Sequence, residues 1–61
     1  MTYEVIARFE GGFINTWTYE NTSIENITEL FKEANKKQGT FRAVVLTIKC
    51  IESGAVEVID L

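Results

Sequence analysis

Residues 22–39 read TSIENITELFKEANKKQG, and this stretch decides the fold because it holds the one helical pattern of the chain. Its apolar side chains fall within a stripe about 120° wide when successive residues are set about 100° apart. They are Ile24, Ile27, Leu30, Phe31 and Ala34. The Thr22 hydroxyl fits a capping box with Glu25, and Gly39 fits a positive-φ stop. We therefore predict an amphipathic helix with one face packed on the rest of the chain.

A β-hairpin is predicted before the helix, from residues 3–10 and 13–20. A two-residue loop between these strands would scatter their aromatic side chains over both faces of the sheet. A three-residue loop, with Gly12 at positive φ, instead pairs Val5 with Trp17. We prefer this register because it brings five aromatic residues to one face, namely Tyr3, Phe9, Phe13, Trp17 and Tyr19.

A second hairpin is predicted after the helix, from residues 41–52 and 55–61. A three-residue loop would place the Asp60 carboxylate in the core, so a two-residue loop is preferred. In that register Glu57 lies on the core side of the sheet near Cys50.

The predicted fold class is α+β, with the order ββαββ and a four-stranded, mainly antiparallel sheet that carries one helix on one face. The 61 residues form a single domain, 1–61, without linkers or repeats. A chain of this length buries only about 60% of its unfolded surface, so we expect marginal stability.

One helix covers only one face of such a sheet. We expect the covered face to carry Tyr3, Val5, Phe9, Phe13, Trp17, Tyr19, Val44, Leu46, Ile48 and Ile59. The other face then carries seven large apolar side chains, namely Ile6, Ile14, Phe41, Val45, Ile51, Val56 and Val58.

This second face is predicted to be an interface, because soluble monomers rarely expose so large an apolar patch. The residues expected to form the contact are Ile14, Val45, Ile51, Val56 and Val58. The face would serve either a homodimer, packed sheet on sheet, or another protein. The alternative interpretation is that these side chains are isolated apolar residues on the surface, which need no partner.

Residues suited to catalysis or metal binding are few. The chain has no histidine, so it lacks a histidine-based triad or zinc ligand. Its one cysteine, Cys50, lies in a predicted strand and is expected to be a small buried apolar residue. No pair of carboxylates is forced into a cleft. We therefore predict a protein that is not an enzyme, with no catalytic, metal or cofactor site.

Composition also bears on compartment and partners. The first residues lack the pattern of a secretory signal, and no apolar run could cross a bilayer, so a cytoplasmic protein without a membrane partner is expected. The net charge of −3 argues against broad nucleic-acid affinity. A small nucleic-acid-binding regulator is the alternative function, and it would use a basic patch near the end of the helix. That patch consists of Lys32, Lys36, Lys37 and Arg42.

The local signals Phe9-Glu10-Gly11-Gly12-Phe13 and Tyr19-Glu20-Asn21-Thr22 are ordinary turn and cap sequences. In size, mild acidity and hairpin–helix–hairpin plan, the chain resembles the small cytoplasmic proteins that phages and prophages encode as host inhibitors or anti-defence proteins. The resemblance implies a protein-interaction module that binds and inhibits a host protein by occupying its surface. It implies no functional residue.

Overall fold

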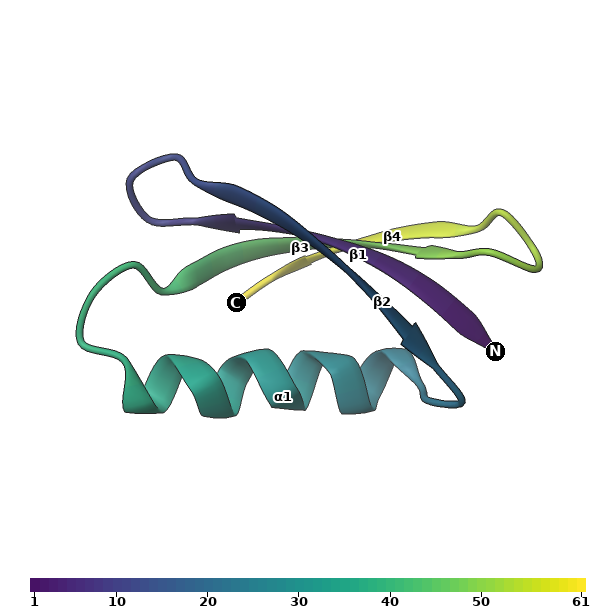
Figure 1. Ribbon diagram of the computed structural model, residues 1–61, viewed down its shortest axis with the longest axis horizontal. Coiled ribbons are helices and arrows are strands. Elements are labelled where there is room, and N and C mark those ends of the chain that lie inside the picture. Colours follow the sequence, from purple (N-terminus) through teal and green to yellow (C-terminus); the bar gives the residue numbers. More distant parts are fainter.

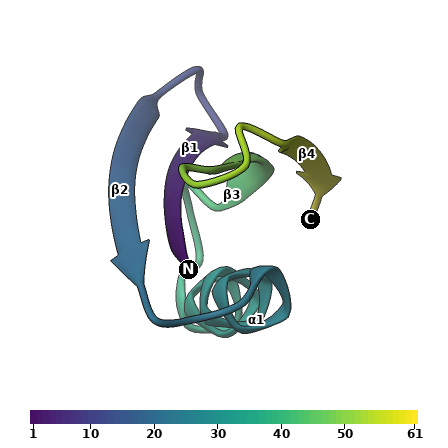
Figure 2. The same cartoon turned by 90° about the vertical axis from the view of Figure 1, so that its right-hand side faces the viewer.

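The computed structural model describes residues 1–61. Its elements are β1 (Thr2–Phe9), β2 (Ile14–Glu20), α1 (Ile24–Lys37), β3 (Ala43–Cys50) and β4 (Val56–Asp60). The strands form one antiparallel sheet in the order β2-β1-β3-β4. The helix lies against one face of this sheet, and nothing covers the other (Figures 1 and 2). The predicted α+β class and ββαββ order are confirmed.

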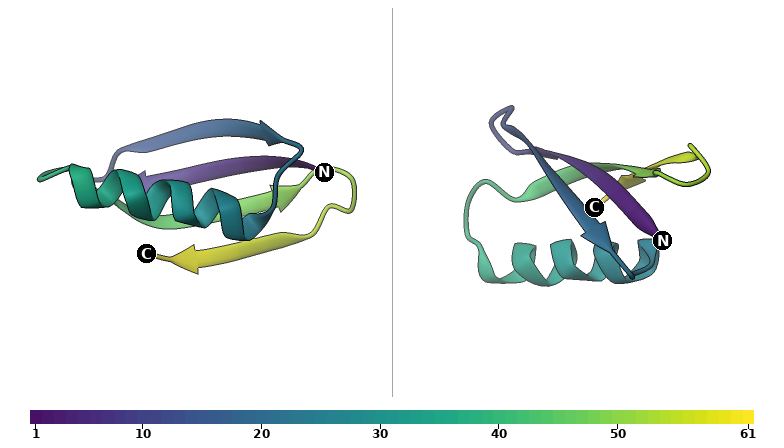
Figure 3. Two further views of the ribbon diagram at one scale, coloured as in Figure 1. Left: turned by 90° about the horizontal axis from the view of Figure 1, so that it is seen from below. Right: turned by 45° about the vertical axis from the view of Figure 1, so that its right-hand side comes forward.

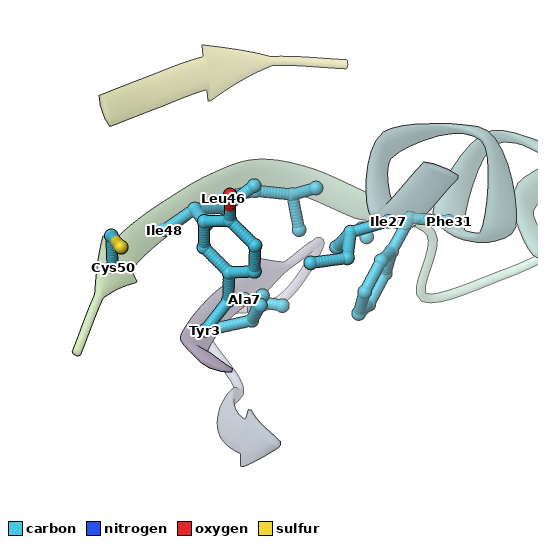
Figure 4. Packing of buried hydrophobic residues seen from close by; sticks show 9 residues of the cluster. Tyr3, Ala7, Ile27, Phe31, Leu46, Ile48 and Cys50 are labelled. Carbon is cyan, nitrogen blue, oxygen red and sulfur yellow. The ribbon is translucent and has the colours of Figure 1, made fainter. Parts of the chain in front are cut away.

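The core lies between α1 and the two central strands, β1 and β3. Figure 3 shows α1 crossing beneath these strands, with β4 at the margin of the sheet. Ile27 of the helix and Leu46 of β3 have no exposed surface (Figure 4). The nine buried side chains are Tyr3, Val5, Ala7, Ile27, Phe31, Ala43, Leu46, Ile48 and Cys50.

The first hairpin has the predicted three-residue loop. Val5 pairs with Trp17, and the Phe9 amide donates to the Phe13 carbonyl at 2.8 Å. Gly12 has a φ of 89°, which a side chain would disfavour. One expectation is wrong, because Phe13 does not join the covered face. It is 58% exposed, and its ring packs edge-on against Phe41 with the centroids 5.2 Å apart.

A β-bulge shifts the start of β3. Arg8 pairs with Val45 and Phe9 pairs with Ala43, so Val44 is an extra residue on β3. Ala43 is therefore buried, whereas Val44 is exposed, which corrects the prediction that Val44 lies on the covered face.

The helix holds Ala43 in its buried position. The Asn35 side chain on α1 accepts a hydrogen bond from the Ala43 amide and donates one to the Ala43 carbonyl, both at 2.9 Å. Phe41 precedes the strand in a loop, with a φ of 55°, and so does not lie on the second face of the sheet as predicted.

The second hairpin turns over four residues, 51–54, and the predicted two-residue Ser53-Gly54 loop is wrong. Pairing with β4 ends at Cys50, whose amide donates to the Ala55 carbonyl at 2.9 Å, while the next two residues remain bonded to the start of β1. The Ile51 amide donates to the Thr2 carbonyl at 2.9 Å, and the Glu52 carboxylate accepts from the Thr2 amide at 2.9 Å.

The longer turn shifts the β3–β4 register by two residues. Glu57 consequently pairs with Ile48 in place of Cys50 and is exposed. Because a shift of two residues keeps every side chain on its own face, the predicted faces of β4 hold.

Both ends of the helix differ in detail from the prediction. The N-cap is Ser23, whose hydroxyl accepts from the Asn26 amide at 3.2 Å, and not Thr22. The last turn closes through the Gln38 amide, which donates to the Ala34 carbonyl, and no positive φ is needed at Gly39. Ile27 and Phe31, at the centre of the apolar stripe of the helix, are the two helix residues that are buried.

Candidate interaction surface

Figure 2 shows the face of the sheet that α1 leaves uncovered. Alternate residues of all four strands lie on this face. Strand pairing arranges these side chains in three rows, each written from β2 to β4. The first row is Ile14, Arg8, Val45 and Asp60; the central row is Thr16, Ile6, Thr47 and Val58; and the last row is Thr18, Glu4, Lys49 and Val56. We call these twelve residues the open face, and the pair Thr2 and Glu20 adjoins its last row on the same side of the sheet.

Five of the twelve side chains on the open face are large and apolar. Ile14 and Val58 are each 63% exposed, Val56 is 58% exposed and Ile6 is 40% exposed. Val45 lies between them and is half-buried. These residues occupy all four strands, so the apolar surface extends across the whole width of the sheet.

The charges on this side of the sheet nearly cancel. Glu4, Asp60 and the adjoining Glu20 are acidic, and Arg8 and Lys49 are basic. This side of the sheet therefore carries a net charge of −1, and the rest of the chain carries the remaining −2 of its net charge of −3.

The open face is hollowed on one side. A shallow depression of about 270 Å³ lies between the first and central rows. Its lining residues are Ile6, Arg8, Ile14, Val45, Thr47 and Val58. The last row, with Glu4 and Lys49, does not contribute to it, so the two halves of the face differ in relief.

Four of the five predicted contact residues lie on the open face, namely Ile14, Val45, Val56 and Val58. Ile51 lies outside it, in the turn after β3, where it is 49% exposed. Ile6 occupies the middle of the face although it was not among the five. Strict alternation along β1 is the signal that places it there.

The predicted basic patch is interrupted by acidic neighbours. The Lys36 ammonium lies 3.1 Å from the Glu33 carboxylate, and the Glu10 carboxylate accepts from the Arg42 amide at 3.0 Å. Lys32 is exposed on α1. The nucleic-acid alternative stays a prediction.

Four aromatic residues of the first hairpin, Tyr3, Phe9, Trp17 and Tyr19, pack in or against the core beneath the helix. Trp17 packs edge-on against Phe31, with ring centroids 5.3 Å apart, and against Phe9 at 6.1 Å. Tyr3 is buried and Tyr19 is half-buried. Their rings thus contribute to the core and do not form an exposed stacking platform.

Cys50 is buried, as expected, with its Sγ 3.8 Å from the Met1 Sδ and 3.6 Å from the Glu52 Oε1. The backbone amide of Thr2 donates to Glu52 and is the main reason that the pKa of this carboxyl is lowered. Glu52 therefore has a structural partner. No three histidine, cysteine, aspartate or glutamate side chains gather as a metal site would require.

The helix of this fold is too short and too polar to span a bilayer. No family model matches the sequence, and no curated protein or solved structure is significantly similar to it.

Proposed function

We propose that this chain is a non-enzymatic protein-interaction module that forms a homodimer through its open face. The observation that carries the proposal is the band of five large apolar side chains on the face that the helix leaves uncovered. A soluble chain of this size rarely leaves so many large apolar side chains on one face of a sheet without a partner.

The energetics of a small domain support this proposal. Burying one such side chain fully contributes about 1.5–3 kcal/mol, and a domain of 61 residues has little stability of its own. Two open faces can pack about 10 Å apart, as the sheets of a β-sandwich do.

The mechanism we propose is steric. The module acts by covering a protein surface with its open face, and the polar residues among the apolar ones restrict which surface fits. The resemblance to small phage proteins makes a host protein in the cytoplasm the proposed target of inhibition. In that case the open face is shared between self-association and the target.

Substitution of Val58 tests the proposal. Val58→Lys places a charge in the central row of the open face, and should convert a dimeric wild type into a monomer in light scattering or sedimentation. Leu30→Lys is the matched control, because Leu30 is 54% exposed on the helix, away from the open face. This control should remain dimeric.

Circular dichroism should give the same folded spectrum for all three proteins, so that a change in mass reports association. A wild type that stays monomeric at high micromolar concentration would overturn the proposal. The proposal also fails if Val58→Lys remains a dimer.

A further inference from the structure

We infer that copies of this chain associate end to end, with the exposed rings of Phe13 and Phe41 of one copy seated at an apolar hollow on the opposite end of the next. This contact goes beyond the proposed homodimer, because it involves the two ends of the molecule. Three features carry it, namely an exposed aromatic pair at one end, a hollow at the other, and opposite charges around the two.

The aromatic pair lies where two loops meet, at the left of Figure 1. The Glu10 amide donates to the Arg42 carbonyl at 2.9 Å, and the Glu10 carboxylate accepts from the Arg42 amide at 3.0 Å. Phe13 and Phe41 lie on these joined loops, where they are 58% and 54% exposed and contact each other edge-on. We call residues 10–13 and 38–42 the aromatic end.

The backbone holds the two rings in place. Phe41 has a φ of 55°, which is uncommon for a bulky side chain. Gly11 leaves room for both rings, since a Cβ atom there would lie 3.2 Å from the Phe13 ring and 3.4 Å from the Phe41 ring. A pair of rings that is already ordered loses little conformational freedom when it binds.

The opposite end of the molecule carries an apolar hollow of about 250 Å³. It lies between the start of α1, the end of β3 and the turn before β4, at the right of Figure 1. Its lining residues include Tyr3, Ile24, Ile48, Ala55 and Glu57. A cavity of about 150 Å³ is large enough to hold benzene, so this hollow can accept one phenyl ring.

The two ends carry opposite charge. The aromatic end and the last turns of α1 carry three basic and two acidic side chains, namely Lys36, Lys37, Arg42, Glu10 and Glu33. The end with the hollow carries one basic and five acidic side chains, namely Lys49, Glu4, Glu20, Glu25, Glu52 and Glu57. The net side-chain charges are therefore +1 and −4, and two such ends attract each other.

Two cations of the aromatic end are available to a second copy. Lys37 and Arg42 are exposed, and neither forms a salt bridge within the chain. They flank the rings along the chain, so a ring seated at the hollow brings them toward its acidic surroundings. Apolar contact at the centre with charged pairs around it is the usual composition of a protein interface.

The positions of the two ends determine the kind of assembly. They lie at opposite ends of the longest dimension of the molecule, which is 35 Å. A contact between two different surfaces leaves a free aromatic end and a free hollow on every assembly, so copies add in a row. The contact of one or two rings is small, so it should be transient and should need more protein than the open-face dimer.

Val58→Lys provides the background for the test, because it removes the proposed open-face dimer. This protein should be monomeric at micromolar concentration, and its mass in sedimentation should rise as the concentration approaches millimolar. In this background, Phe13→Ser/Phe41→Asn removes both rings, and asparagine tolerates the positive φ. Ala55→Lys instead places a cation in the hollow. Each variant alone should lose the rise in mass.

An equimolar mixture of these two variants should form a 1:1 complex and nothing larger. One variant keeps the hollow and the other keeps the rings, so each mixture holds a single productive contact. Ile51→Lys is the matched control for Ala55→Lys, because it adds the same charge to the same turn but outside the hollow. It should keep most of the rise in mass.

Several results would refute the end-to-end contact. They are a Val58→Lys protein that stays monomeric at millimolar concentration, a rise in mass that either variant leaves unchanged, and a mixture that does not associate. A loss for Ile51→Lys as large as that for Ala55→Lys would refute the seat at the hollow. None of these results bears on the proposed homodimer, which the wild type tests at micromolar concentration.

Discussion

A single carboxylate ties the turn after β3 to the first residue of β1. The Oε1 and Oε2 atoms of Glu52 accept from the Thr2 amide at 2.9 Å and 3.2 Å. This bond, followed by one from the Glu52 amide itself, lowers the pKa of the carboxyl from its usual 4.5. Glu52 therefore helps to hold the start of β1 in place, although its side chain stays in water.

This lowered pKa predicts a dependence of stability on pH. The charged Glu52 is favoured by folding, so its contribution is fully present above the unfolded pKa and is lost as the pH falls through the lower folded value. Glu52→Gln should therefore unfold at less urea than the wild type at neutral pH, and this difference should shrink as the pH falls below about 4.5. Urea titrations of both proteins over a range of pH, at a fixed protein concentration, measure this difference in the urea midpoint.

The control for this prediction is Glu57→Gln, which removes an exposed carboxylate in β4. It should leave the urea midpoint close to that of the wild type. A difference between Glu52→Gln and the wild type that stays constant from neutral to acidic pH would contradict the proposed role of the Thr2 bond.

Contacts of this kind lie beyond what the sequence alone can predict. Glu52 and Thr2 are fifty positions apart, and Asn35 reaches Ala43 only because α1 and β3 pack together. A glutamate in a turn and an asparagine on a helix look like ordinary surface residues in the sequence. Their roles depend on tertiary placement, which local patterns do not encode.

The secondary-structure elements themselves were largely predictable, because each rests on a periodic pattern. Alternation of apolar residues predicted the face of every residue of β4 correctly. It could not predict the length of the turn before β4, since two-residue and four-residue turns leave the same side chains on the same face. The bulge at Val44 was missed for a related reason. The alternation of side chains from Val45 onward is the same with or without the bulge, and only the residues before Val45 change face.

The start of the helix provides a prediction at this scale. Thr22 and Ser23 are both suitable caps, and only the backbone conformation decides between them. Ser23 is extended and its hydroxyl accepts from the Asn26 amide. Ser23→Ala should therefore lower the free energy of unfolding by about 1 kcal/mol, whereas Thr22→Ala should lower it by about 0.5 kcal/mol or less.

Chemical denaturation, followed by circular dichroism, measures this difference between the two caps. The ranking of the two variants is the informative result, since each removes one hydroxyl from adjacent positions. A larger loss for Thr22→Ala would mean that the predicted capping box with Glu25 forms in solution in place of the Ser23 cap.

At the scale of the whole molecule, one helix of fourteen residues faces a sheet with apolar side chains on both sides. This imbalance was predictable, because it follows from counting apolar residues on each face of the predicted strands. Four of the five residues chosen from the sequence lie on the open face. Ile51 follows the end of β3 and lies in the turn, where it is 49% exposed.

Thermal unfolding of the whole molecule should depend on protein concentration if the open face forms the dimer. A partner that binds only the folded chain stabilises it by mass action. With an unfolding entropy of about 2.1 cal/mol/K per residue, each tenfold dilution should lower Tm by roughly 5 °C while the dimer predominates. Val58→Lys should keep one Tm at all concentrations, and Leu30→Lys should follow the wild type. A wild-type Tm that does not move over about a hundredfold range of concentration would mean that the open face has no partner in a second copy.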